Sequence, residues 1–300
     1  MRDLIELLAF HDERELKKEK WLYHGFILCE VQKCSMLVCD LVDKKNEAEC
    51  PVGDRIRFVK LTSKSAGSPS TKTVVKWAEL FRDKCYMNMW FYLLGINLAN
   101  INYDAFGPKS NGQDRIFRIY NRFFEMGLYS ACRWFFNPDT MDVEIENMFS
   151  EDRSLEKDNP FTFYAPYKIN KKESNIKVKN KHITQISSTP SKERNYPDYV
   201  HVLNLVDILV GSFSEVFDYS STQDGCVEVA EKLYGICDEL SKNPFNDRSL
   251  YYKKCAMSFF PKQKLKLSEI MQSRTSQLNN QFYNKRQPRL NQLPLFQSFI

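Results

Sequence analysis

The stretch YVHVLNLVDILVGSFSEVF, residues 199–217, is an almost wholly apolar helix candidate. Asp207 interrupts it, with Asn204 three positions before and Gly211 four positions after, so the three residues share one stripe of the helix. An unpaired buried charge in that stripe would be costly. Two partners for Asp207 stay open: a metal ion held between this helix and a strand end, or a structural pairing with Lys, Arg or a helix cap.

Strand-like and helical segments alternate on either side of this helix. The patterns predict strands at 4–10, 21–31, 55–61, 90–98, 143–149 and 182–187, and helices at 74–85, 114–136, 199–217 and 225–240. Strands that alternate with helices indicate an α/β protein with a layered sheet. The sequence therefore predicts a mixed sheet flanked by helices, followed by a helical C-terminal extension.

Composition places the chain among folded proteins. With 43% hydrophobic residues it can bury a substantial core, which excludes global disorder. No uninterrupted apolar run reaches the roughly 18 residues of a membrane span, and Asp3 and Glu6 break the N-terminal stretch that a signal peptide needs. The nine cysteines show no C-x-x-C pair or zinc spacing, which favours reduced thiols. We therefore expect a cytoplasmic protein.

Acidic residues stand at the carboxyl ends of two predicted strands. Asp12 and Glu13 come where the first strand stops, and Glu151 follows the strand that ends at Phe149. Ligands of α/β sheets bind at such ends, although an ordinary strand-to-turn aspartate is an equal interpretation of Asp12 alone. Phosphodiester hydrolysis uses two divalent cations about 4 Å apart held by carboxylates. Because Mg²⁺ prefers oxygen ligands, these acids with Asp207 predict a Mg²⁺ or Mn²⁺ site.

A family resemblance extends this interpretation. It is carried by FHDE (10–13), YNRFFEMGL (120–128), VEIENMFSED (143–152) and LNLVDILVGSFSEVFD (203–218). In order and spacing these pieces resemble a bacterial domain-of-unknown-function family, numbered thirty-eight hundred, over roughly residues 1–240. Members of that family resemble ribonuclease H in fold and are often associated with mobile elements and antiphage defence. The resemblance implies a ribonuclease-H-like domain at 1–218. The amphipathic pattern at 225–240 predicts a helical extension at 219–270, and the Gln-, Asn- and Ser-rich residues 271–300 predict a flexible tail.

The resemblance also assigns roles. It implies Asp12, Glu13, Glu151 and Asp207 as catalytic residues, and Asp12, Glu151 and Asp207 as metal ligands. Asp104 is a further candidate ligand, as the acid that remains downstream of Asn97. Three positions depart from the family pattern: Arg14 replaces a Ser, Asn204 replaces a Gln, and Asn97 stands where related chains often have an Asp. Losing one carboxylate ligand weakens metal binding, so Asn97 and Arg14 favour a catalytically degenerate form.

Two segments suggest binding partners. Residues 168–194 hold eight Lys and Arg against two acids, so Lys177, Lys179 and Lys181 are candidates for nucleic-acid contact; a solvated loop is the alternative. Near the C-terminus, Gln292, Leu293, Leu295 and Phe296 belong to QLPLF, which resembles the peptide that docks bacterial proteins on the DNA sliding clamp. A C-terminus packed on its own domain is the alternative for that peptide.

Three functions follow from different classes. The preferred one is a metal-dependent nuclease acting on DNA or RNA, in antiphage defence or mobile-element biology, recruited through a sliding clamp. The second is a degenerate subunit that senses nucleic acid or the clamp without cutting. The third is a toxin-like or scaffold subunit of a defence complex.

Overall fold

The computed structural model describes nine stretches of the chain. They are residues 2–16, 21–61, 67–107, 112–138, 140–152, 162–172, 174–218, 223–242 and 254–260. The predicted tail at 271–300, with its clamp-like peptide, lies outside the described residues.

A seven-stranded mixed sheet forms the centre of the protein. Its strands are β1 (Asp3–Leu16), β2 (Trp21–Glu30), β3 (Met89–Asn97), β4 (Met141–Glu151), β5 (Ile176–Val178), β6 (Thr184–Ile186) and β7 (Cys255–Phe260). The order is β5-β4-β1-β2-β3-β7, with β6 also paired to β4. Strand β1 is antiparallel to β2 and parallel to β4, β2 is antiparallel to β3, and β5 and β7 run parallel to β4 and β3.

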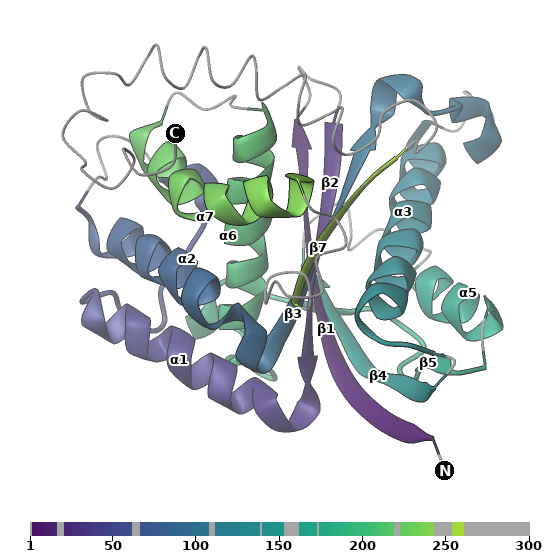
Figure 1. Cartoon of the computed structure of the whole chain (residues 1–300), viewed down its shortest axis with the longest axis horizontal. Coiled ribbons are helices and arrows are strands. Elements are labelled where there is room, and N and C mark those ends of the chain that lie inside the picture. The colour runs from purple at the N-terminus through teal and green to yellow at the C-terminus, as the bar shows by residue number, and fades with distance from the viewer. Residues whose placement is uncertain are drawn as a thin grey trace.

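Helices cover both faces of the sheet (Figure 1). They are α1 (Cys34–Glu47), α2 (Pro69–Asn88), α3 (Gly112–Phe135), α5 (Tyr164–Lys172), α6 (Tyr199–Asp218) and α7 (Asp224–Lys242). Helices α1, α2, α6 and α7 lie on one side, and α3 and α5 lie on the other (Figure 1). Alternate residues of β1 serve the two layers, because Leu8 and Phe10 join the α6 core whereas Leu7 and Ala9 join the α3 core.

The structure confirms the α/β class and most of the predicted elements. The predictions at 21–31, 90–98, 143–149, 199–217 and 225–240 agree with β2, β3, β4, α6 and α7. The prediction of a strand at 55–61 is wrong. That segment contains only a 3-10 turn (Phe58–Lys60), and its alternation arises because Ile56 and Phe58 are buried in the α6 core.

Other departures concern boundaries and missed elements. Strand β1 runs on to Leu16, so Asp12 and Glu13 lie within the strand rather than beyond its end. Helix α1 was not predicted; its buried Cys34, Leu37, Val38 and Leu41 have helical spacing. The region expected as a helical extension holds α7 and also β7, which pairs with β3 in the main sheet.

Helix α6 is the central core helix. By length and hydropathy its Tyr199–Phe217 stretch could cross a membrane, but 94% of the window tested is buried inside the protein. Such burial is typical of the core helix of a soluble protein. The eight described cysteines are thiols, and seven are buried, as the absence of a disulfide framework predicts.

Candidate active site

Asp12 and Glu151 are neighbours on adjacent parallel strands. The β1–β4 register pairs Phe10 with Phe149 and His11 with Ser150, so the next step along both strands brings Asp12 beside Glu151. Phe10 and Phe149 stack with ring centroids 5.2 Å apart in the α6 core. Because side chains alternate along a strand, Asp12 and Glu151, each two positions further on, face α6 as well. Both are buried, at 3% and 7% exposure.

Helix α6 approaches the sheet closely at this point. Gly25 is the β2 partner of Asp12, and a Cβ atom there would overlap Val210 of α6, so only glycine permits this approach. Further along β1, Arg14 donates from Nη1 to the Gly211 carbonyl at 3.0 Å. Asp12 therefore lies beside the part of α6 that contains Asp207.

The backbone of the 51–61 segment holds one oxygen of the Asp207 carboxylate. Its Oδ2 accepts a hydrogen bond of 2.8 Å from the Phe58 amide. The Phe58 ring packs on Gly211, where a Cβ would overlap it, and the Arg14 guanidinium carbon lies 4.8 Å from the ring centroid. The 51–61 segment therefore packs on the face of α6 that carries Asp207 and Gly211, which is the stripe predicted from the sequence.

Two arginines of that segment enter the cluster. Arg55 and Arg57 both pair with Glu151, Arg57 at 3.5 Å, and Ser188 donates to the same carboxylate at 2.6 Å. The pKa of Arg55 is lowered by burial, raised by Glu151, lowered by Arg57 and raised by Asp207. Arg55 is thus within electrostatic reach of both acids. We call Asp12, Glu151, Asp207, Arg55 and Arg57 the acid–arginine cluster.

A buried lysine fixes the segment that carries the arginines. Lys45 of α1 donates to the carbonyls of Val52 and Asp54 at 2.8 and 2.6 Å. Its side chain is fully buried, and burial lowers its pKa. Since these carbonyls directly precede Arg55, the lysine helps to set where the guanidinium lies.

The residues suit a divalent cation in donor type but not in spacing: among the described residues, the acids whose ligand atoms lie within 4.8 Å of one another are Glu6, Glu144 and Glu146. Three carboxylates from β1, β4 and α6 face one layer, and Mg²⁺ and Mn²⁺ prefer such ligands. Arg55 and Arg57 place positive charge beside Glu151, and Arg55 also interacts with Asp207. In the described part of the chain, Arg55 Nε and Asn204 Nδ2 are buried donors without an acceptor, so this region also has capacity for an oxygen acceptor. A cation here would compete with Arg55 for Glu151.

Glu13 and Asp104 are not brought to this cluster. Glu13 points to the opposite face, where its Oε2 is 3.4 Å from the Tyr120 hydroxyl and 4.0 Å from His11 Nδ1. Asp104 lies in a 3-10 turn on that same α3 side, largely exposed and 4.0 Å from Arg115. Successive residues of a strand face opposite sides, so Asp12 and Glu13 cannot both point into one site from β1.

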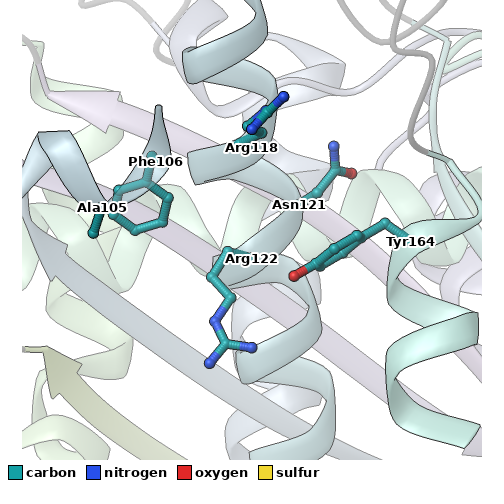
Figure 2. A pocket seen from close by; sticks show the side chains of 6 residues that line it. All are labelled: Ala105, Phe106, Arg118, Asn121, Arg122 and Tyr164. Atoms are coloured by element: carbon teal, nitrogen blue, oxygen red, sulfur yellow. The ribbon is translucent and has the colours of Figure 1, made fainter. Parts of the chain in front are cut away.

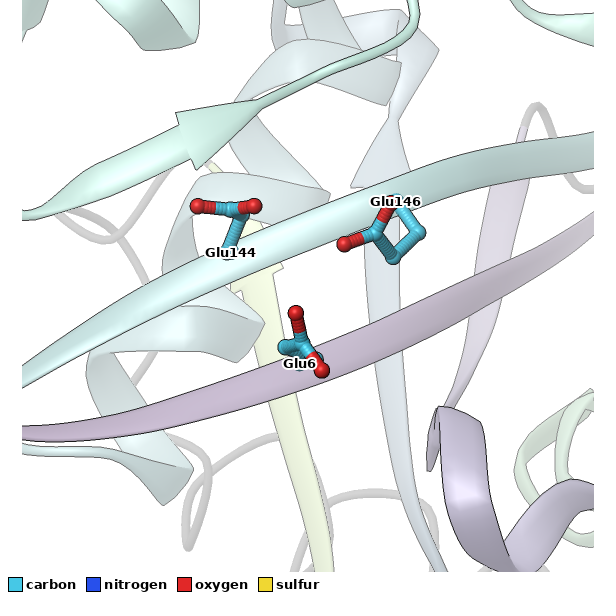
Figure 3. A group of neighbouring side chains, drawn as sticks. All are labelled: Glu6, Glu144 and Glu146. Carbon is cyan, nitrogen blue, oxygen red and sulfur yellow. The ribbon is translucent and has the colours of Figure 1, made fainter.

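A second group of acids gathers elsewhere on the sheet. Glu6 of β1 and Glu144 and Glu146 of β4 lie near one another and could hold a metal ion (Figure 3). Lys179 pairs with all three, at 3.8 Å from Glu6. These acids therefore already have a cation, and the pairing of Lys179 with them lowers its availability for nucleic acid.

The remaining predicted residues differ in placement. Lys177, in the middle of β5, and Lys181, between β5 and β6, are exposed. Gln292, Leu293, Leu295 and Phe296 lie outside the described residues. Arg55 and Arg57 were not predicted from the sequence; a signal existed, because the buried Asp207 required a cation and these two arginines alternate with the apolar Ile56 and Phe58.

Comparisons with known proteins add no relative: no family model, no curated protein and no solved structure matches the chain.

Proposed function

We propose that this protein is a metal-dependent nuclease of ribonuclease-H-like type that acts on DNA or RNA. The observation that carries the proposal is that Asp12, Glu151 and Asp207, from β1, β4 and α6, lie on the α6 side of the sheet, with Arg55 within electrostatic reach of Glu151 and Asp207. The antiparallel β1–β2–β3 unit, with β4 parallel to β1 and α6 packed back on β1, agrees with that fold. Membership of the family numbered thirty-eight hundred belongs to the same proposal.

In this proposal Asp12, Glu151 and Asp207 hold Mg²⁺ or Mn²⁺, which when bound activates water and neutralises charge on the leaving oxygen. The Phe58 amide orients the Asp207 carboxylate, and Ser188 orients that of Glu151. Arg55 and Arg57 offer guanidinium groups that match phosphate oxygens once they leave Glu151. In this proposal the acids of the cluster supply a cation site, and its arginines supply a phosphate-binding site.

A second function has a specific observation in its favour. Arg55 and Arg57 neutralise Glu151, and an acid paired in this way is a structural element rather than a metal ligand. This agrees with the degenerate form suggested by Asn97 and Arg14. The protein would then bind nucleic acid, or serve as a subunit of a defence complex, without cutting.

The test is Asp207→Asn, assayed on plasmid, single-stranded DNA and RNA with Mg²⁺ or Mn²⁺. We expect cleavage to be abolished and nucleic-acid binding to persist, because the carboxylate acts on transition-state charge whereas lysines and arginines provide affinity. The matched control is Asp142→Asn, a half-buried acid of β4 outside the cluster, which should cut like the parent. Undiminished cutting by Asp207→Asn would place the site elsewhere; no cutting by the parent would favour the binding subunit.

The remaining proposals concern location and partners. We keep a cytoplasmic location, antiphage defence and clamp recruitment as parts of the proposal. Lys177 and Lys181 remain candidates for phosphate contact because they are exposed, whereas Lys179 is paired with three acids. Changing Lys177 and Lys181 to Ala should flatten the salt dependence of nucleic-acid binding by about one slope unit for each phosphate that the protein no longer neutralises.

A further inference from the structure

A cavity opens on the opposite face of the sheet from the acid–arginine cluster. It has a volume of about 440 Å³ and lies between a 3-10 turn (Tyr103–Phe106), α3 and α5. Its lining consists of Ala105, Phe106, Arg118, Asn121, Arg122 and Tyr164 (Figure 2). Cavities of roughly 300–1,000 Å³ are the usual size for small-molecule sites.

Two guanidinium groups border this cavity from one helix. Arg118 and Arg122 are four residues apart on α3, a spacing at which like charges repel each other. Arg122 donates to Glu125 at 2.6 Å, and Lys172 pairs with the same buried carboxylate. Among the carboxylates whose side chains the structure describes, none lies within ion-pair distance of Arg118. An anion between the two arginines would therefore relieve their repulsion.

Aromatic rings complete the lining. Phe106 and Tyr164 come from different elements and lie on opposite sides of α3 (Figure 2). The Lys168 ammonium is 5.6 Å from the centre of the Tyr164 ring, which adds positive charge at this rim. Asn121 lies buried between the arginines and donates to the Phe117 carbonyl at 2.8 Å.

Paired guanidinium groups recognise phosphate oxygens, and aromatic rings stack on nucleobases. We infer that this cavity binds a nucleotide, with its phosphate between Arg118 and Arg122 and its base against Tyr164. The nucleotide is either free or one unit of a single strand. The inference does not rest on the proposed nuclease function, because the cavity lies across the sheet from Asp12, Glu151 and Asp207. An acidic peptide would bind the two arginines but would not require stacking on Tyr164.

The experiment measures binding to the full-length protein in EDTA, so that no divalent cation contributes. The probes are a fluorescein-labelled decamer of thymidylate, ADP, inorganic pyrophosphate and a polyglutamate peptide. We expect Arg118→Gln to weaken decamer or ADP binding about tenfold, as loss of a charge-assisted hydrogen bond predicts. Tyr164→Leu should weaken the same binding and leave any pyrophosphate binding unchanged.

Arg133→Gln is the matched control. This exposed arginine is on the same helix, eleven residues and about 16 Å beyond Arg122. We expect less than a twofold change, with all variants melting like the parent by circular dichroism. Binding of ADP identifies a free nucleotide, and binding of the decamer alone identifies a strand.

Three outcomes would overturn the inference. They are no saturable binding of either nucleotide probe, equal weakening by Arg118→Gln and Arg133→Gln, or equal affinity for a polyglutamate peptide and ADP with no effect of Tyr164→Leu. None of them depends on cleavage, so the failure of this inference and the failure of the nuclease proposal are distinguishable.

Discussion

A substitution of Arg55 tests whether the acid–arginine cluster is a metal site or a structural ion pair. Removing one partner of a buried pair costs about 3–5 kcal/mol when nothing else compensates. Arg55 keeps 27% of its side chain exposed, and Glu151 retains Arg57 and Ser188. We therefore expect Arg55→Met to lower the free energy of unfolding by about 1–3 kcal/mol in EDTA. At about 2–4 °C per kcal/mol, the melting temperature should fall by roughly 2–12 °C.

The assay is thermal and urea denaturation of four proteins, with EDTA and with 5 mM Mg²⁺ or Mn²⁺ added. These are the parent, Arg55→Met, the double variant Arg55→Met/Glu151→Gln, and Arg133→Met as a surface control. If the cluster holds a cation, added metal should raise the free energy of unfolding of Arg55→Met by RT ln(1 + [L]/Kd), where [L] is the free metal concentration. The free energy of unfolding of the double variant should not change.

Two results would refute this reasoning. If Arg55→Met is as stable as the parent, the guanidinium does not neutralise the acids. If Glu151→Gln rescues Arg55→Met while metal does not, the cluster is a structural ion-pair network, and the binding subunit becomes the better function.

Three further predictions concern stability and the tail. Burial lowers the pKa of His24 to about 3, and burial with Lys45 lowers that of His201 to about 4. Because both values lie below the unfolded pKa of 6.5, the stabilisation from each neutral histidine is fully present above pH 6.5 and is lost as the pH falls towards the folded-state pKa. Urea denaturation at pH 7 and pH 5 should show a loss of about 2 kcal/mol per histidine, and His24→Gln should reduce the difference. Gly25→Ala should destabilise by about 1–3 kcal/mol, since the methyl group would overlap Val210; an unchanged urea midpoint would contradict the close approach of α6. A labelled peptide of residues 290–300 should bind bacterial or phage clamps with micromolar affinity. Absence of saturable binding would favour the alternative, a C-terminus packed on its own domain.

The candidate site was only partly readable in the sequence. The acids could be found because strand ends and an apolar helix make carboxylates conspicuous. The grouping of these acids could not be predicted, since it depends on which face of the sheet each carboxylate lies on. Asp12 and Glu13 are adjacent in sequence yet serve opposite layers, and Asp104 lies on the side away from Asp207.

The sequence by itself determined the α/β class, the apolar helix at 199–217 and the need of Asp207 for a partner, because composition and periodicity are local properties. Tertiary structure alone decided that partner. The Phe58 amide and the charge of Arg55 reach it across about 150 residues, because Lys45 and Gly211 let the 51–61 segment pack on α6. The alternation of that segment predicted a strand, but strands require a neighbouring strand to pair with, and there the neighbour is a helix.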